Sequence, residues 1–127
     1  MNYAQTIEYL FTTTPSFQQV GADAYKPGLE RIREFCHYLG DPQNNYCTIH
    51  VAGTNGKGSV SHMLASVLQH AGYRVGLFTS PHLRDFRERM RVDGEMISER
   101  GVVDFVANHK AKMHELDLSF FEMTTAM

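Results

Sequence analysis

The chain has 127 residues, 43% hydrophobic and 20% charged, a composition typical of a globular protein with room for one compact domain or slightly more. Its formal net charge of −2 provides no basic excess to neutralise phosphates, which argues against a general nucleic-acid-binding protein. The sequence shows neither an apolar run near the roughly 20 residues of a membrane span nor a signal peptide, so we expect a cytoplasmic protein without a membrane or nucleic-acid partner.

Apolar residues at helical spacing predict two helices in the first third of the chain. The first covers residues 3–11, and a loop rich in Thr, Gly and Pro follows over residues 12–27. The second helix covers residues 29–39 and ends at Gly40. We assign residues 1–45 to an N-terminal helical segment.

A change of pattern at Tyr46 predicts the start of an α/β unit. Residues 46–51 are β-prone, a glycine turn follows at once, and apolar spacing predicts a helix over residues 57–71. A second strand is predicted over residues 73–78. Strand, glycine turn, helix and strand in this order are typical of a βαβ unit, so we expect the two strands to be parallel neighbours.

A hairpin and a further helix are predicted in the last third. The dipeptide Asp93-Gly94 favours the positive φ angles of a two-residue turn, and it lies between the β-prone segments 90–92 and 95–97. A helix capped by Ser98 is predicted to run to about Leu116. Ser119-Phe120-Phe121 then begins another element, for which a strand is one candidate. The expected fold class is α/β, with N-terminal helices followed by the start of a P-loop-type doubly wound sheet that carries a β-hairpin insertion.

The segment Gly53-Thr54-Asn55-Gly56-Lys57-Gly58-Ser59 is the strongest local signal for a ligand site. Its glycines allow a tight turn in which successive N–H groups point at one anion, and a helix N-terminus adds partial positive charge. Lys57 can reach terminal phosphate oxygens, and the hydroxyl of Ser59 or Thr54 can meet Mg²⁺. The standard P-loop pattern is not satisfied, because it requires Gly at Val51 and Ser or Thr at Gly58. The expected order of strand, loop and helix nevertheless predicts phosphate binding.

Several segments resemble motifs of the folylpolyglutamate synthase and dihydrofolate synthase branch of the Mur ligase superfamily, and they follow one another in the same order as in that branch. Ile49-His50-Val51-Ala52-Gly53-Thr54-Asn55-Gly56-Lys57-Gly58-Ser59-Val60 resembles the nucleotide loop of that branch. The similarity also covers residues 28–32, 71–83, 88–94 and 120–126. By this resemblance, residues 46–127 are the first part of a Mur-ligase-type ATP-binding domain.

The resemblance implies an ATP- and Mg²⁺-dependent ligase of folate biosynthesis, monomeric in its complete form. The γ-phosphate of ATP would pass to the carboxylate of dihydropteroate or folate, and the amine of L-glutamate would attack the resulting acyl phosphate. The residues assigned to ATP are Thr54, Asn55, Gly56, Lys57, Gly58 and Ser59, with Lys57 also catalytic. Mg²⁺ is assigned to Ser59 and Ser80. The pterin site is assigned to Ser119, Phe120, Phe121 and Glu122, with a covering loop at Tyr25, Lys26 and Pro27.

The resemblance also places essential parts of the enzyme beyond residue 127: a second domain, a modified lysine, and a glutamate and a histidine of the magnesium site. We therefore expect a fragment that is marginally stable, self-associates and forms no amide by itself. The alternatives are another amide ligase of the Mur superfamily and a non-catalytic nucleotide-binding fragment. His50, His62 and His82 lack a recognised metal-ligand spacing. The basic cluster Arg84, Arg87, Arg89 and Arg91 is expected to form a solvated, ion-paired surface.

Overall fold

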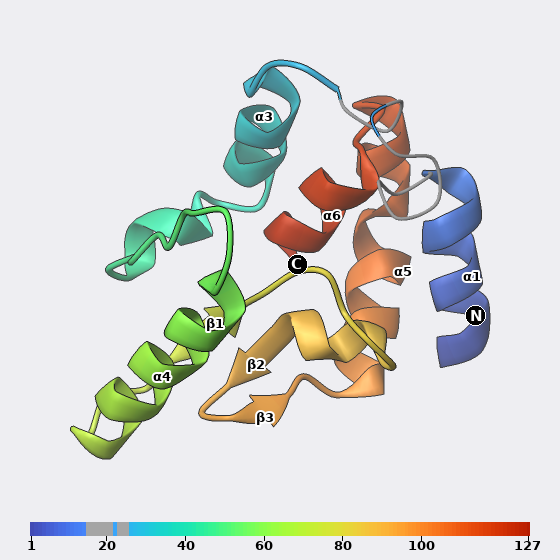
Figure 1. The fold of residues 1–127 in the computed structure, drawn as a ribbon. Helices are drawn as coiled ribbons and strands as arrows, with labels where there is room; N and C mark the ends of the chain where they lie inside the picture. Colours follow the sequence, from blue (N-terminus) through green and yellow to red (C-terminus); the bar gives the residue numbers. More distant parts are fainter. Residues whose placement is uncertain (15–21, 23–25) are drawn as a thin grey trace. The chain divides into compact units, whose positions relative to one another are not determined.

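The structure is a computed structural model that describes residues 1–14, 22 and 26–127, and it combines helices with a small sheet (Figure 1). The chain is therefore of the α/β class. It divides into two compact units, which we call the helical unit (Met1–Cys47 and Glu99–Met127) and the sheet unit (Thr48–Ser98). No described helix is both long and apolar enough to cross a membrane. The domain boundary placed after residue 45 stays a prediction.

The helical unit contains the helices α1 (Tyr3–Thr13), α3 (Glu30–Tyr38), α5 (Glu99–Glu115) and α6 (Phe120–Ala126), and a short 3-10 helix at Pro42–Asn45. Helix α1 packs against α5, and α3 packs against α6 (Figure 1). The helices predicted over residues 3–11, 29–39 and 98–116 are thus confirmed to within two residues at each end. Gly40, with φ of 87°, ends α3 as predicted.

Apolar residues from all four of these helices form the core of the helical unit. The side chains of Leu10, Phe35, Val102 and Val106 are completely buried. The ring of Phe120 stacks on that of Phe11 with centroids 4.9 Å apart. Each buried aliphatic or aromatic side chain of this kind contributes about 1.5–3 kcal/mol through removal of apolar surface from water. This burial stabilises the helical unit.

Residues 120–126 form helix α6, and the strand that was one candidate for this segment is wrong. The hydroxyl of Ser119 accepts a hydrogen bond from the N–H of Glu122 (3.2 Å), and the Glu122 carboxylate accepts one from the N–H of Ser119 (2.8 Å). This reciprocal pair is a capping box, which satisfies N–H groups that a helix start otherwise leaves without acceptors. The local sequence Ser-Phe-Phe-Glu therefore selects a helix.

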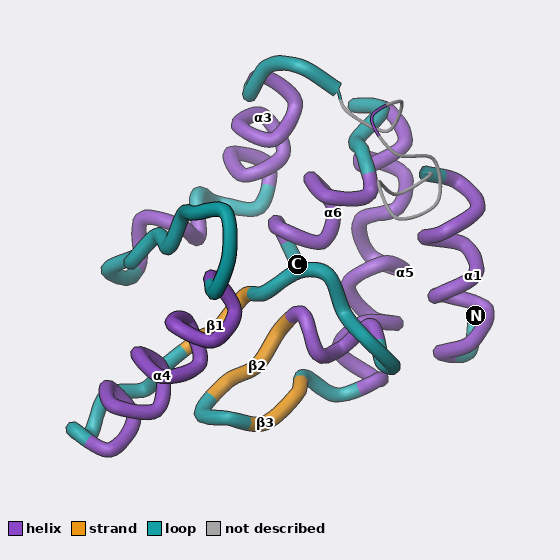
Figure 2. The backbone as a smooth tube through the Cα atoms, in the orientation of Figure 1, coloured by secondary structure: helices purple, strands orange, loops and turns teal. Residues whose placement is uncertain are grey.

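The sheet unit contains helix α4 (Lys57–His70), the strands β1 (Gly76–Phe78), β2 (Met90–Val92) and β3 (Glu95–Met96), and a 3-10 helix at Phe86–Arg89. The strand order is β1-β2-β3 with both pairings antiparallel, and α4 packs beside β1 (Figure 2). Asp93 and Gly94 have φ of 51° and 85°. The predicted hairpin with two positive φ angles in its turn is thus confirmed.

The strand predicted over residues 46–51, and its parallel pairing with residues 73–78, are wrong. No strand is present at 46–51, and β1 instead pairs antiparallel with β2, placing Gly76 opposite Val92. A strand requires a neighbour that complements its N–H and C=O groups, and in the described residues only the hairpin sheet provides such pairing. The predicted βαβ unit is therefore absent and cannot support phosphate binding. The evidence for binding must come from the geometry of the glycine loop itself.

Candidate functional site

The loop Gly53–Ser59 leads directly into the N-terminus of α4. Gly56 is the N-cap residue and has φ of 77°, in the left-handed region that L side chains disfavour. It offers no side-chain cap, and the N–H of Val60 donates to the Gly56 carbonyl at 3.0 Å to begin the helical bonds. The N–H groups of Lys57, Gly58 and Ser59 consequently have no acceptor within the helix. A helix end of this kind is suited to an anion.

The ammonium group of Lys57 lies over the same loop. Its Nζ donates to the carbonyl oxygens of Gly53 (2.5 Å) and Thr54 (3.3 Å). These carbonyls keep the ammonium near the positive end of the α4 dipole, so both sources of positive charge lie together. The loop is exposed, and a side-chain carbon added at Gly58 would meet nothing within 4 Å. The site is therefore open to a phosphate-bearing ligand.

Ser80 is exposed on the loop that follows β1, and the carboxylate of Glu88 organises the remainder of that loop. This carboxylate accepts hydrogen bonds from three backbone N–H groups: Leu83 (2.9 Å), Arg84 (2.9 Å) and Asp85 (2.7 Å). Because these bonds stabilise the ionised form, they lower the pKa of Glu88 to about 2. The Ser80 loop is thus held by a permanently charged acceptor at neutral pH.

Arg89 is buried, with 3% of its surface exposed, and the expectation that it lies on a solvated basic surface is wrong. Its Nε donates to Nδ1 of His82 at 2.8 Å, which requires that this ring nitrogen carries no proton. Burial and the charge of Arg89 together lower the pKa of His82. The arginine therefore joins the His82 side of the loop to the start of β2.

The structure brings together the two segments assigned to the pterin, through an arginine that sequence reasoning gave no role. Arg31 donates from Nη2 to the carbonyls of Lys26 (3.1 Å) and Pro27 (3.3 Å), and from Nε to the Glu122 carboxylate (3.3 Å). Lys26 also pairs with Asp117 (Nζ to Oδ2, 2.7 Å). The residues 26–27 and 119–122 thus form one polar cluster.

The two phenylalanines of the predicted pterin site have different environments. Phe120 is 3% exposed and belongs to the core, whereas Phe121 is 55% exposed. Only Phe121 therefore presents a ring face that a flat heterocycle could stack on. Glu122 is mostly buried and already binds Ser119 and Arg31. Tyr25, also assigned to the pterin, lies outside the described residues.

The residues assigned to Mg²⁺ supply hydroxyl oxygens, Ser59 from the first turn of α4 and Ser80 from the loop after β1. Mg²⁺ prefers oxygen ligands, keeps several waters and commonly uses few protein groups together with phosphate oxygens. The chemistry of these two donors fits that ion. Within residues 1–14, 22 and 26–127, no group of three or more His, Cys, Asp or Glu side chains gathers as a metal cluster.

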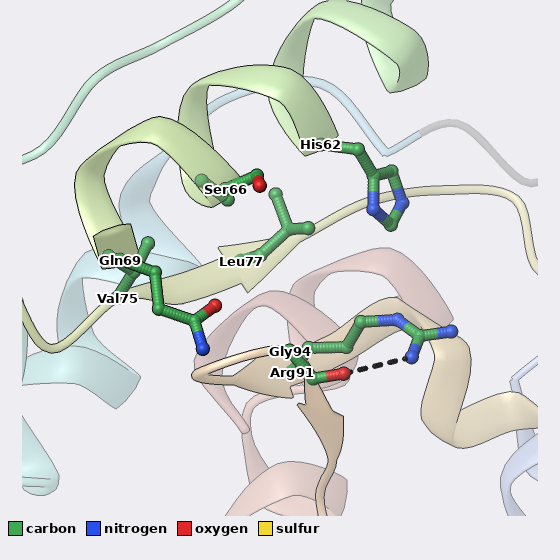
Figure 3. Close-up of a pocket in the computed structure, with 8 residues that line it drawn as sticks. His62, Ser66, Gln69, Val75, Leu77, Arg91 and Gly94 are labelled. Carbon is green, nitrogen blue, oxygen red and sulfur yellow. Dashed lines mark hydrogen bonds between the residues drawn. The ribbon is translucent and has the colours of Figure 1, made fainter. Parts of the chain in front are cut away.

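A cavity of about 210 Å³ lies between α4 and the hairpin (Figure 3). Polar side chains of α4 line one wall, Val75 and Leu77 line another, and Arg91 donates from Nη1 to the Gly94 carbonyl at 3.4 Å. The residues assigned to ATP, Mg²⁺ and the pterin do not line this cavity. It is therefore a feature separate from the predicted sites.

Comparison with known proteins shows relatives over the full chain, although no protein-family model matches it. The chain is 41% identical over 132 residues to a probable bifunctional folylpolyglutamate synthase/dihydropteroate synthase of Haloferax volcanii, covering 100% of the chain and 15% of that relative. It is 37% identical over 134 residues to the folylpolyglutamate synthase of Lacticaseibacillus casei, covering 100% of the chain and 30% of that relative. The chain thus spans less than a third of the length of these relatives.

Solved structures show the same relationship. The crystal structure of folylpolyglutamate synthase from Thermotoga maritima matches 98% of the chain and 28% of its own length, with a TM-score of 0.82 and 43% identity. The Escherichia coli FolC protein in complex with DHPP and ADP matches 99% of the chain and 29% of its own length, at TM-score 0.84 and 32% identity. An FPGS–AMPPCP–folate complex matches 99% of the chain and 31% of its own length, with a TM-score of 0.82 and 37% identity.

Identity at this level over essentially the whole chain accompanies a common fold, and the relatives agree in their description. The matched region includes the glycine loop at the start of α4 and the loop after β1, because the alignments cover 98–100% of the chain. The chain is therefore similar over its whole length, in sequence and in fold, to a part of folylpolyglutamate synthases and dihydrofolate synthases.

Proposed function

We propose that the protein containing this chain is an ATP-dependent ligase that joins L-glutamate to dihydropteroate or to a folate. The observation that carries this proposal is the open loop Gly53–Ser59, where Lys57 lies over the uncapped N-terminus of α4. The similarity to folylpolyglutamate synthases over the whole chain supports it, as do the ligands of two similar structures, DHPP with ADP in one and AMPPCP with folate in the other.

The loop residues Thr54–Ser59 hold the phosphates of ATP in this proposal. Backbone N–H groups of the first turn of α4 bind phosphate oxygens, and the Lys57 ammonium neutralises charge that develops on the transferred group. Mg²⁺, held by the hydroxyls of Ser59 and Ser80, would neutralise further phosphate charge when bound. Positioning and charge neutralisation are the main tasks of a protein in phosphoryl transfer.

The chemical sequence is a phosphoryl transfer followed by amide formation. A carboxylate oxygen of the pteroate or folate attacks the γ-phosphorus of ATP, which gives an acyl phosphate and ADP. The amine of glutamate then attacks the acyl carbon, inorganic phosphate leaves, and the amine loses a proton. The chain contributes by holding the phosphates beside the carboxylate and by excluding other orientations.

The polar cluster of the helical unit would receive the pterin. Phe121 offers an exposed ring face for stacking, and Lys26 and Pro27 border the same cluster through their bonds to Arg31. Phe120 and Glu122 would support the pterin site without contacting the ligand. Phe120 packs in the core, and Glu122 holds Ser119 and Arg31 in place.

The direct test measures ADP release by the intact protein with ATP and Mg²⁺, adding L-glutamate together with dihydropteroate or folate. We expect ADP release to require both glutamate and one of the two pteroate compounds. Lys57→Ala should lower kcat about 10²–10³-fold, the effect of removing one preorganised group that stabilises transition-state charge. Lys110→Ala, an exposed lysine on α5, is the matched control and should leave kcat unchanged. ADP release that does not depend on glutamate or on either pteroate compound would favour a ligase of different specificity, and no ADP release at all would favour a non-catalytic nucleotide-binding protein.

A further inference from the structure

We propose that Glu88 is a positioning residue of the ligase, because its carboxylate holds the loop after β1 in the shape that presents the Ser80 hydroxyl to Mg²⁺. The inference rests on the proposed function of Ser80 as a magnesium ligand. Glu88 itself is not assigned to the metal, since its carboxylate is occupied by the protein backbone.

Both carboxylate oxygens of Glu88 bind the loop. Oε2 accepts from the N–H of Leu83 at 2.9 Å, and Oε1 accepts from the N–H groups of Arg84 at 2.9 Å and Asp85 at 2.7 Å. Hydrogen bonds to an ionised acceptor are shorter and roughly twice as strong as those between neutral groups. The C-terminal half of the loop is thus fixed by one side chain.

The other half of the loop is fixed by the backbone of the same short segment. The N–H of Thr79 donates to the Arg89 carbonyl at 3.0 Å, and the Thr79 hydroxyl donates to the Glu88 carbonyl at 3.4 Å. Residues 88 and 89 therefore bind the loop both immediately before and shortly after Ser80. Ser80 itself remains exposed between these two attachments.

Helix capping alone does not explain this arrangement. Glu88 is the third residue of the 3-10 helix Phe86–Arg89 and forms a reciprocal capping box with Asp85. Of the three bonds that the Glu88 carboxylate accepts, this box uses only the one from the Asp85 N–H. The bonds to Leu83 and Arg84 lie outside the helix and add nothing to its cap. They constrain the loop, and the exposed group at the centre of the constrained loop is Ser80.

The experiment compares Glu88→Gln and Glu88→Ala with Ser80→Ala in the intact protein. We measure the Mg²⁺ concentration for half-maximal glutamate-dependent ADP release and, without nucleotide or metal, the amide exchange of residues 83–85. Glu88→Ala should speed exchange at these amides about tenfold or more and raise the Mg²⁺ requirement severalfold. Glu88→Gln keeps an acceptor oxygen but loses the negative charge. Its amide exchange rates and its Mg²⁺ requirement should therefore lie between those of Glu88→Ala and those of the unaltered protein. In the double variant Ser80→Ala/Glu88→Ala, the fold-increase in the Mg²⁺ requirement should be smaller than the product of the fold-increases of the two single variants.

The outcomes separate this inference from the proposed function. If Ser80→Ala raises the Mg²⁺ requirement and neither Glu88 variant does, Ser80 is a ligand and Glu88 is not a positioning residue. If Ser80→Ala leaves the requirement unchanged, the proposed metal role of Ser80 is wrong and the inference fails with it. Faster amide exchange with an unaltered Mg²⁺ requirement would reduce Glu88 to a structural residue. Glu115→Gln, which alters an exposed carboxylate paired with Lys112 on α5, is the matched control and should change neither measurement.

Discussion

The helical unit and the sheet unit differ in what holds them together. In the helical unit, Leu10, Phe35 and Val106 are fully buried, as are further residues of α5 and α6. In the sheet unit, α4 has no buried residue at all, and its apolar side chains Met63 and Val67 are 67% and 66% exposed. One unit is thus built around an apolar core, whereas the principal helix of the other leaves its apolar face uncovered.

Polar contacts hold much of the sheet unit instead. The Asp93 carboxylate accepts from the N–H of Val75 at 2.8 Å, and Gln69 donates to the Asp93 carbonyl at 3.0 Å, which connects the hairpin turn to α4 and to the residue before β1. Glu88 does the same for the Ser80 loop. Loops that bind ligands commonly lie in the less stable parts of a protein. The proposed phosphate and magnesium residues therefore lie in the unit with fewer buried apolar side chains.

The largest expected effect is the loss of unfolding free energy when a buried side chain of the helical unit is removed. Phe35→Ala removes a fully buried ring from the helical unit and should cost about 3–5 kcal/mol of unfolding free energy. Met63→Ala on α4 should change it by no more than about 0.5 kcal/mol, because that side chain is 67% exposed. Urea denaturation followed by circular dichroism measures both. Equal losses would show that α4 is buried in solution and that the two units do not differ in this respect.

A smaller effect is expected at the hairpin turn of the sheet unit. Gly94→Val should destabilise the protein by about 1 kcal/mol or more, because φ at this position is 85° and a β-branched residue is strained there. Space is not the reason, since an added side-chain carbon would lie 3.6 Å from Gln69. Gly76→Val is the matched control in β1, where φ is not positive and the added carbon meets nothing within 4 Å. The denaturation midpoint should fall for Gly94→Val only, and equal shifts would point to a different turn.

The smallest effect concerns pH and should be confined to the Ser80 loop. The pKa of Glu88 is lowered from 4.5 to about 2 by its bonds to Leu83, Asp85 and Arg84. A depressed carboxyl pKa stabilises the fold fully above about pH 4.5, and that contribution is lost as the pH falls toward 2. The amide NMR shifts of residues 83–85 should therefore titrate with a midpoint well below 4.5. A midpoint near 4.5 would show that these hydrogen bonds do not persist in solution.

Local patterns in the sequence were enough to predict most helices and the hairpin. Apolar spacing defines α1, α3 and α5, and Asp93-Gly94 defines the turn, because these signals act over a few residues. The pairing of a strand depends instead on its partners, so the β-prone residues 46–51 could not be assigned correctly from their own composition.

In the candidate site, too, local patterns predict some residues and miss those that depend on distant partners. The glycine loop and Lys57 were visible in the sequence, and the reciprocal signature of Asp85 and Glu88 would have been visible as a capping box. Arg31 was not, because the glutamate that it binds lies 91 positions further along the chain. Contacts at that separation depend on how α3 and α6 pack, which local patterns do not encode.

The phosphate-binding role of the Gly53–Ser59 loop is tested most directly by the affinity of the chain for MgATP with and without the Lys57 ammonium. Hydrogen bonds to charged groups contribute about 1.5–3 kcal/mol, so Lys57→Ala should weaken binding about 10- to 100-fold in calorimetric titration. Lys110→Ala, exposed on α5 of the helical unit, should bind as the unaltered chain does. An unchanged Kd for Lys57→Ala, with the circular dichroism spectrum preserved, would contradict the claim that the Gly53–Ser59 loop holds the phosphates.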